Sequence, residues 1–466
     1  MFDTIIIGGG PAGYLAAERL GHEKKKVLLI EQQYMGGTCL NVGCVPTKTL
    51  LNSAKQYVHA KEAGKFGINA QNVTYDWKAV QGWKTEVITK LRSGIESMMK
   101  RFGVETMNGR GEILSPPSGE IRARVKSISP NGNETIHEGK TILVCAGSVP
   151  VIPPIPGAKD NSLIVDSSAL LSAEKVPKRI VIIGGGVIGI EFAGLYSALG
   201  SEVKIIEMMD EIVPFMDKEQ SPILRKAMKD VVFKLGCKVE MIEGGTVHYI
   251  TKEGAKECTL ADTVLLAVGR RPVLDTWGGA AAGIDITRTG VQVDDYMRTN
   301  IPRIWAAGDV TGKSLLAHSA YRMGEVAAAD IIAGLEGNNK NKTNKMRYNA
   351  IPWAVYGITE AAGVGITEQE ADAKGIKILK ASLPMKMSGR FAAENTFNAP
   401  GTVKVIADAS NRRILGIHAV GAYSPEFIWG GAALIEQEFR TDEVRELIFP
   451  HPTVSELIRE TVWEIN

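Results

Sequence analysis

The stretch with the clearest chemical potential is GGTCLNVGCVPTK, residues 36–48, which holds two of the five cysteines of this 466-residue chain. Four residues separate Cys39 from Cys44, and the small residues around them would let a short disulfide ring close. The other three cysteines, Cys145, Cys237 and Cys258, are scattered, and zinc normally takes four ligands. We therefore predict no metal site. Two inert buried thiols and a redox-active pair remain as the alternatives for these cysteines.

The residues that follow the two cysteines favour the redox interpretation. Pro46 suits the first turn of a helix, and apolar residues recur at helical spacing from Leu50 to Val58. This pattern predicts a helix over Thr47–Val58 with Cys44 at or just before its N-terminus, after a loop of small residues. The positive end of a helix stabilises a thiolate and lowers the pKa of a cysteine. Thiol–disulfide exchange needs two sulfurs with separate roles because it passes through a mixed disulfide.

The chain contains an internal repeat of a strand, a glycine cluster, a helix and a second strand, and its first copy directly precedes the cysteine stretch. Apolar strands at Ile5–Ile7 and Val181–Ile183 each precede a G-x-G-x-x-G cluster, an Ala- and Leu-rich helical stretch and a second strand ending in Glu31 or Glu207. The clusters are Gly8, Gly10 and Gly13, and Gly184, Gly186 and Gly189. In such clusters the glycines permit a tight turn, close approach of a pyrophosphate and close helix–strand packing. The glutamate can bind a ribose, so the repeat predicts two dinucleotide-binding domains. A carboxylate repels a 2′-phosphate, so Glu207 favours NAD over NADP.

Two further apolar stretches end in small residues: LVCAGS at residues 143–148 and IWAAGD at residues 304–309. The second could bring Asp309 to a polyol such as a ribityl chain. A helix cap or turn residue is an equally open interpretation of Asp309.

One histidine stands in a distinctive context. His451 lies between Pro450 and Pro452, which restrict the backbone, and a fixed imidazole is a better general base. Glu456 could orient that imidazole, or Thr453 and Glu456 could form a capping box at the start of the last helix. The local residues leave both interpretations open.

Composition sets the class of protein. The length predicts two to four domains, and the net charge of +2 gives no electrostatic reason to expect binding to nucleic acid or to an anionic membrane. We find no apolar run of about 18 residues and no basic segment before the first strand. We expect a cytoplasmic protein, in which scattered cysteines do not form a disulfide framework.

These motifs together resemble the flavin-dependent disulfide reductases, the class I pyridine nucleotide-disulfide oxidoreductases. The resemblance covers essentially the whole chain and rests on GGGPAG, GGTCLNVGCVPTK, GGGVIGIEFA, VGRRP at residues 268–272, AAGDV with LLAHSA, and HPTVSE at residues 451–456. It implies an α/β fold with two Rossmann-like dinucleotide-binding domains and a C-terminal α+β dimerisation domain. The implied segments are an FAD-binding domain at 1–145, an NAD-binding domain at 146–274, a central domain completing the FAD site at 275–345 and a dimerisation domain at 346–466.

The resemblance also implies a reaction: oxidation of a protein-bound dihydrolipoyl group to lipoamide with NAD⁺, through a Cys39–Cys44 disulfide and FAD. Cys39 would be the interchange thiol that meets the substrate, and Cys44 the thiol beside the flavin. His451 and Glu456 would form the acid–base pair serving the other subunit of a homodimer. Lys48 and Glu191 would pair near the flavin and the nicotinamide.

The cofactor-binding positions implied by the resemblance are Gly8, Gly10, Pro11, Ala12, Gly13, Glu31, Gly37, Thr38, Lys48, Ala146, Gly147, Gly184, Gly186, Gly189, Glu207, Gly269, Gly308, Asp309, Leu316, Ala317 and His318. The implied partners are lipoyl domains, either of a 2-oxo acid dehydrogenase complex or of the glycine cleavage system. Another FAD-dependent disulfide reductase of the glutathione type is one alternative, which Glu207 and LLAHSA disfavour. An NADH oxidase or diaphorase is another, which the cysteine pair disfavours.

Overall fold

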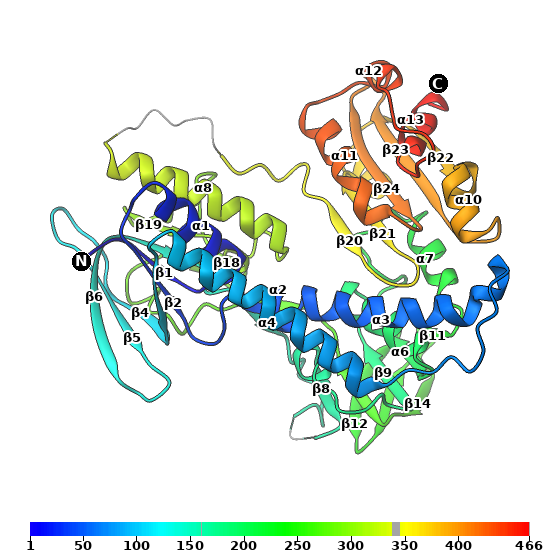
Figure 1. Ribbon diagram of the computed structural model, residues 1–466, viewed down its shortest axis with the longest axis horizontal. Helices are drawn as coiled ribbons and strands as arrows, with labels where there is room; N and C mark the ends of the chain where they lie inside the picture. Colours follow the sequence, from blue (N-terminus) through cyan, green and yellow to red (C-terminus); the bar gives the residue numbers. More distant parts are fainter. Residues whose placement is uncertain (160, 338–344, 466) are drawn as a thin grey trace. The chain divides into compact units, whose positions relative to one another are not determined.

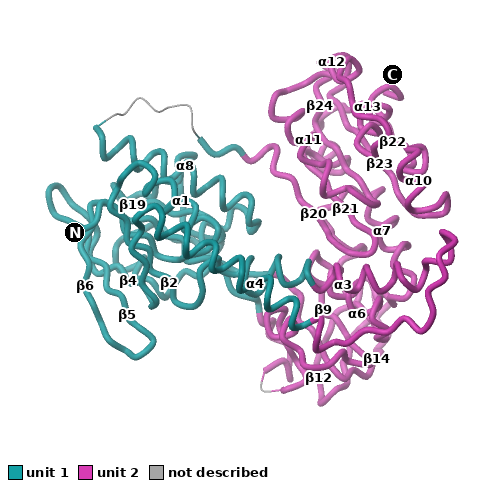
Figure 2. The backbone as a smooth tube through the Cα atoms, viewed as in Figure 1, with its two compact units in different colours: residues 1–49, 81–151, 270–347 teal, residues 50–80, 152–269, 348–466 magenta. Residues whose placement is uncertain are grey.

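The computed structural model describes residues 1–159, 161–337 and 345–465, and the chain divides into two compact units (Figure 2). Unit 1 comprises residues 1–49, 81–151 and 270–347, and unit 2 comprises residues 50–80, 152–269 and 348–466. The chain passes from one unit to the other within α3 (Cys44–Glu62) and α4 (Trp77–Arg101). The predicted FAD-binding and central segments thus fall mainly in unit 1. The end of the central segment, predicted near residue 345, includes residues 338–344, which lie outside the described residues.

Unit 1 is built on a seven-stranded sheet in the order β3-β2-β1-β6-β5-β4, with β19 also paired to β6. The strands β3, β2, β1, β6 and β19 are parallel, and β4 and β5 are antiparallel. The strands are β1 (Phe2–Ile7), β2 (Val27–Glu31), β3 (Glu105–Asn108), β4 (Arg110–Ser115), β5 (Ala123–Ile128), β6 (Glu134–Val144) and β19 (Ile304–Ala306). Ile5 and Ile6 on adjacent positions are both fully buried, because both faces of a parallel sheet are covered.

The helices of unit 1 place the cysteines. Helices α1 (Pro11–His22) and α8 (Ala317–Leu335) lie side by side (Figure 1), and α2 (Gly37–Val42) directly precedes α3. Short elements complete the unit: β7 (Ser148–Pro150), β16 (Arg270–Pro272), β17 (Ile286–Thr287), β18 (Gly290–Val291) and the 3-10 turn η2 (Asp309–Thr311).

Unit 2 contains the second dinucleotide-binding sheet, which is parallel, with strand order β11-β10-β9-β15-β8. Its strands are β8 (Ile164–Asp166), β9 (Arg179–Ile183), β10 (Glu202–Ile206), β11 (Val231–Lys234) and β15 (Thr263–Leu266). An antiparallel sheet of β12 (Lys238–Glu243), β13 (Thr246–Ile250) and β14 (Lys256–Leu260) adjoins it in sequence. The helical elements are η1 (Ala63–Phe66), α5 (Ser167–Leu170), α6 (Val187–Ala198) and α7 (Ser221–Ala227).

The C-terminal part of unit 2 is an antiparallel sheet with helices, in the strand order β20-β21-β24-β23-β22. The strands are β20 (Trp353–Val355), β21 (Ala361–Gly365), β22 (Ile378–Pro384), β23 (Thr402–Asp408) and β24 (Ile414–Val420). The helices are α9 (Glu368–Ala373), η3 (Met385–Met387), α10 (Gly389–Asn395), α11 (Ser424–Glu436), α12 (Thr441–Glu446) and α13 (Glu456–Trp463). Two Rossmann-like sheets and a C-terminal α+β part confirm the predicted fold class.

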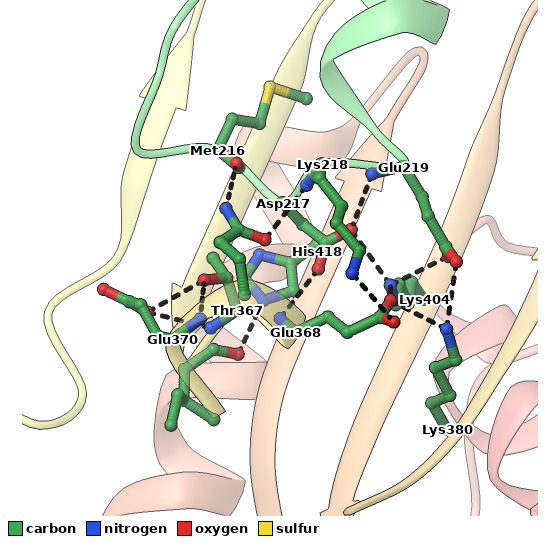
Figure 3. A network of polar contacts seen from close by, with 12 residues as sticks. Met216, Asp217, Lys218, Glu219, Thr367, Glu368, Glu370, Lys380, Lys404 and His418 are labelled. Carbon is green, nitrogen blue, oxygen red and sulfur yellow. Dashed lines mark hydrogen bonds and ion pairs between the residues drawn. The ribbon is translucent and has the colours of Figure 1, made fainter. Parts of the chain in front are cut away.

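A buried charge network joins the two parts of unit 2 (Figure 3). Lys404 of β23 is fully buried, and its Nζ lies 3.0 Å from Asp217, 2.8 Å from Glu219 and 2.7 Å from Glu368. Burial opposes ionisation of Glu368, but hydrogen bonds from Lys380 and Lys404 outweigh it and lower the pKa of Glu368 to about 2. The ammonium group of Lys404 therefore neutralises carboxylates from the segment before α7 and from α9.

The helices of the described residues differ from membrane-spanning helices. Within the described ranges of the chain, none of them combines the length and the apolar character that a membrane crossing requires.

Candidate active site

The two cysteines lie on consecutive helices of unit 1. Cys39 is in α2, and Cys44 is the first residue of α3. Gly43 joins the helices, and a Cβ at this position would lie 2.9 Å from the carbonyl oxygen of Thr38 and 3.3 Å from Cα of Cys39. A side chain at position 43 would therefore push the two cysteine-bearing segments apart.

The expected loop of small residues before Cys44 is wrong, because Gly37–Val42 is helical. Asn41 supports this turn, since its Nδ2 donates to the carbonyl oxygens of Gly37 (2.9 Å) and Met35 (3.0 Å). Arg92 of α4 in turn donates to Oδ1 of Asn41 at 2.7 and 3.0 Å. This contact from a distant part of the chain is invisible in the local sequence.

Both cysteines are in the reduced form, without a disulfide bond between them, and are half-buried. The Cys39 thiol is hydrogen-bonded to Cys44, and this contact, together with burial, raises the pKa of Cys39, while the Lys48 ammonium group opposes the rise. This hydrogen bond holds the two sulfurs together and makes Cys39 the thiol that keeps its proton more readily than an isolated cysteine. An arrangement of this kind suits a disulfide that opens into two inequivalent thiols.

The first glycine cluster leaves its second position open. Gly8 has a φ of +105°, and a Cβ there would lie 2.1 Å from the Cys145 carbonyl oxygen. A Cβ at Gly13 would lie 1.9 Å from the Gly8 carbonyl oxygen, whereas at Gly10 the nearest atom is Cα of Gly37 at 3.9 Å. The backbone at the start of α1 is thus accessible to a phosphate, which free N–H groups there would bind.

The second glycine cluster repeats this geometry at the start of α6. Gly184 has a φ of +110°, a Cβ at Gly189 would lie 2.0 Å from the Gly184 carbonyl oxygen, and nothing lies within 4 Å of a Cβ at Gly186. A pyrophosphate site requires this combination: the first and third positions have no room for a side chain, and the second leaves the backbone open to the phosphate. The residues of both clusters therefore fit the dinucleotides that the sequence implies.

The two fingerprint glutamates make equivalent contacts. Glu31 accepts from the N–H groups of Gly9 (2.7 Å) and Gln33 (2.8 Å). Glu207 accepts from the N–H groups of residues 185 (2.5 Å) and 209 (2.7 Å). Because an ionised carboxylate has about four acceptor positions, each can still accept from ribose hydroxyls.

Asp309 lies in a polar chain that sequence reasoning missed. Oδ2 of Asp309 accepts from the Ser148 hydroxyl at 2.6 Å. Oγ of Ser148 in turn accepts from Nε of Arg270 at 2.9 Å. A guanidinium nitrogen of Arg270 also lies 3.4 Å from Oγ1 of Thr38 in α2. Burial raises the pKa of Asp309 against the opposing hydrogen bond from Ser148. Asp309 begins the turn η2, in agreement with the turn interpretation. Binding of a polyol by this buried carboxyl group stays a prediction.

The remaining predicted FAD positions also lie in unit 1. Leu316, Ala317 and His318 form the N-terminus of α8. Ala146 and Gly147 follow β6, and Gly308 precedes η2. Gly147 and Gly308 have φ values of +73° and +79°, the left-handed conformation that glycine adopts most readily. Pro11 and Ala12 open α1, and Lys48 lies in the first turns of α3.

His451 and Glu456 form a hydrogen-bonded pair in unit 2. Nδ1 of His451 lies 2.8 Å from Oε2 of Glu456, and the imidazole is 79% exposed while the carboxylate is 15% exposed. The Glu456 N–H donates to Oγ1 of Thr453 at 3.3 Å. The carboxylate of Glu456 therefore faces the imidazole rather than completing the capping box that we considered, and only half of that box forms.

Glu191 and Gly269 complete the predicted set in unit 2. Glu191 of α6 is 4% exposed and accepts from the Tyr356 N–H at 3.1 Å, as expected for a carboxylate placed among apolar residues. Gly269 follows β15 with a φ of +106° and has open space at the Cβ position.

A groove of about 620 Å³ lies in unit 1 between α1, α4 and α8. Tyr14, Tyr321, Glu18 and Glu325 supply its polar side chains, and Leu91, Ile95 and Met98 of α4 supply apolar ones. Sequence reasoning missed this groove, because a tyrosine in a fingerprint helix has no local signal that pairs it with a tyrosine about 300 positions later.

Comparisons with known proteins decide the family. The model described as pyridine nucleotide-disulphide oxidoreductase matches residues 2–324, and the dimerisation domain of the same family matches residues 351–462. The chain belongs to the pyridine nucleotide-disulphide oxidoreductases.

Individual members of this family are similar over almost the entire chain. Dihydrolipoyl dehydrogenases of Mycoplasma pneumoniae and Bacillus subtilis are each 34% identical, and each alignment covers 98% of this chain and 97% of the relative. The HOCl-induced flavoprotein disulfide reductase RclA from Escherichia coli has a similar structure, with a TM-score of 0.85, 27% identity and complete coverage of both chains.

Membership confirms the family recognised in the sequence and identifies the chain as an oxidoreductase. It implies FAD and NAD(H) as the cofactors, as predicted, and the dimerisation domain indicates a homodimer. Exposed apolar side chains on the dimerisation domain agree with such an interface: Phe397 is 72%, Trp429 70% and Ile448 97% exposed in the single chain.

Proposed function

We propose that this oxidoreductase oxidises a protein-bound dihydrolipoyl group to the lipoyl disulfide and uses NAD⁺ as the final acceptor. The observation that carries the proposal is the contacting Cys39–Cys44 pair at the start of α3, in a chain that resembles dihydrolipoyl dehydrogenases over nearly its full length. A dithiol substrate matches this pair because one disulfide is exchanged for another.

The reaction begins with attack of a substrate thiolate on the sulfur of Cys39. The Cys39–Cys44 bond breaks, and Cys44 leaves with the electron pair as a thiolate. The second substrate thiol then attacks the substrate sulfur of the mixed disulfide, which closes the lipoyl ring and releases Cys39. The substrate loses two electrons, and the protein disulfide gains them.

We assign His451 as the base that accepts the proton from each substrate thiol before it attacks. The 2.8 Å contact between its Nδ1 and the Glu456 carboxylate fixes the ring and leaves Nε2 for the substrate. The side chain of His451 is 79% exposed in the single chain, as expected for a base that serves the disulfide of the partner subunit in the dimer. The active site would then be complete only in the dimer.

FAD would be held by the first glycine cluster, Glu31, Thr38, the α8 N-terminus and Asp309. When bound, it supplies a two-electron carrier between the disulfide and the nicotinamide. Lys48 would stabilise negative charge on the FAD. Glu191 would lie near the bound nicotinamide.

The second glycine cluster and Glu207 would bind NAD rather than NADP. Glu207 is 9% exposed, and its carboxylate is held by two backbone N–H groups. This fixed negative charge would bind ribose hydroxyls and repel a 2′-phosphate.

The predicted domain segments, the cytoplasmic location and the lipoyl-domain partner belong to the same proposal. A 2-oxo acid dehydrogenase complex and the glycine cleavage system would both supply the required dithiol. An NADPH-dependent reductase of the glutathione type is the alternative, because the similar Escherichia coli protein carries the general name of a flavoprotein disulfide reductase.

The test compares two substrate pairs on one FAD-replete preparation: NAD⁺ with dihydrolipoamide, and NADPH with oxidised glutathione. The proposal predicts that the first pair dominates. A dominant rate with NADPH and glutathione would contradict it, and so would activity with neither pair in a preparation that holds FAD.

A further inference from the structure

Two tyrosines from distant helices form a hydrogen-bonded pair in unit 1. The hydroxyls of Tyr14 in α1 and Tyr321 in α8 are hydrogen-bonded to each other. Their rings pack edge to face, with centroids 5.8 Å apart and planes at 74°. Both side chains line the groove between α1, α4 and α8.

The pair lies near the reactive cysteines. A Cβ at Gly37, the first residue of α2, would lie 2.6 Å from Cα of Gly10 at the start of α1. The Arg92–Asn41 contact fixes α2 to α4. Helix α2, which carries Cys39, is thus held against two of the three helices that form the groove.

Electrostatics agrees with this placement. Burial raises the pKa of both tyrosines, and the charge of Cys39 raises it further at each. The charge of Cys44 also acts on Tyr321. Tyr321 is therefore the member of the pair that is coupled to both sulfurs.

A proton count leaves one hydroxyl hydrogen available. The two phenols carry two hydroxyl hydrogens, and their mutual hydrogen bond uses one. Either hydroxyl can be the donor in that bond; we consider the arrangement in which Tyr14 donates and Tyr321 accepts. The O–H group of Tyr321 is then available to a third atom.

We propose that Tyr321, positioned by Tyr14, donates a hydrogen bond to the Cys39 sulfur as it leaves the mixed disulfide as a thiolate. This inference rests on the proposed function. In that step the second substrate thiol gives its proton to His451 and attacks the substrate sulfur. The bond from that sulfur to Cys39 breaks, and Cys39 takes the electron pair. Tyr321 keeps its own proton throughout.

The surroundings of Cys39 explain the need for a donor. The ionisable groups whose charges act with Cys39 include Cys44 and Lys48 of α3, Tyr14 of α1 and Tyr321 of α8. The neighbouring Cys44 opposes a second negative charge on Cys39, and Lys48 favours it. A hydrogen bond from Tyr321 would supplement Lys48 at the moment when both sulfurs carry charge.

The test measures how the ionisation of the Cys39 thiol depends on pH, and it does not use the substrate. The reduced FAD-replete dimer is alkylated with iodoacetamide over a range of pH, and mass spectrometry follows Cys39 in Tyr321→Phe, Tyr14→Phe and the double variant. Tyr57→Phe is the matched control, because Tyr57 also packs edge to face on a second tyrosine, Tyr75, with centroids 5.1 Å apart. FAD content and circular dichroism check that each variant is folded.

The alkylation midpoint of Cys39 should rise by about one pH unit in Tyr321→Phe, and kcat/KM for dihydrolipoamide should fall about tenfold. Tyr14→Phe should have a smaller effect, the double variant should match Tyr321→Phe, and the control should match the wild type. An unchanged midpoint in Tyr321→Phe and in the double variant would overturn the inference. Failure of the wild type to oxidise dihydrolipoamide would instead overturn the proposed function, and the alkylation shift would still decide the role of Tyr321.

Discussion

Replacing Lys404 by Met tests whether the buried charge network stabilises unit 2. Lys404 and Asp217 are fully buried, and Nζ of Lys404 lies 2.7 to 3.0 Å from the carboxylates of Asp217, Glu219 and Glu368. The substitution leaves Asp217 buried without its cation. Breaking a buried pair by removing one partner costs about 3 to 5 kcal/mol. Two backbone N–H groups still donate to Asp217 at 3.0 Å, so we expect about 3 kcal/mol.

Lys380→Met is the matched control. Its Nζ contacts Glu219 and Glu368, two of the carboxylates that Lys404 contacts, at 3.0 and 2.7 Å, but its side chain is 40% exposed. An exposed pair contributes at most about 1 kcal/mol. Urea denaturation of the FAD-replete wild type and both variants at pH 7, followed by circular dichroism, gives the loss of unfolding free energy in each variant. A loss in Lys404→Met no larger than in Lys380→Met would refute the reasoning.

Lowering the pH should reduce the difference in the free energy of unfolding between the wild type and Lys404→Met. The pKa of Glu368 is lowered from 4.5 to about 2, and the pKa of Asp217 is also lowered, because hydrogen bonds and nearby cations outweigh burial. Lowered carboxyl pKa values contribute stability above about pH 4.5, and this is lost as pH falls towards 2. Denaturation between pH 7 and pH 3 should therefore show a shrinking difference, and a constant difference would contradict the assignment.

Three further outcomes follow from the site. Gly43→Ala should hinder closure of the disulfide, because its Cβ would lie 2.9 Å from the Thr38 carbonyl oxygen; thiol titration of the air-oxidised protein should find more free thiol than in wild type, and an equal count would contradict this. Glu207→Gln should lower the preference for NAD⁺ over NADP⁺ in kcat/KM by about tenfold or more, since like charges in contact cost several kcal/mol; an unchanged ratio would remove the reason for predicting NAD. Glu456→Gln should lower kcat with dihydrolipoamide about tenfold or more while NADH-dependent dye reduction persists, and wild-type kcat would show that its contact with His451 is structural.

The repeated glycine clusters were predictable from sequence because their physics is local. The positive φ of Gly8 and Gly184 and the close packing at Gly13 and Gly189 follow from the turn between one strand and the next helix. The same is true of Glu31 and Glu207, which lie at a fixed distance along the chain from their glycine partners.

Features that depend on distant segments were not predictable. Helix α2 replaces an expected loop, and Asn41 within it accepts a hydrogen bond from Arg92 of the distant helix α4. The Asp309–Ser148–Arg270 chain joins three separate strands and turns. At His451, the sequence left Glu456 with two possible partners, and only the folded chain shows that its carboxylate faces the imidazole.

The most direct test of the central claim is an anaerobic titration of the oxidised FAD-replete protein with dihydrolipoamide, followed by alkylation and mass spectrometry. The account predicts that Cys39 and Cys44 resist alkylation before the substrate is added and become alkylated after it, with one equivalent of dihydrolipoamide consumed per subunit. Oxidation of dihydrolipoamide without a change in the labelling of Cys39 and Cys44 would contradict it.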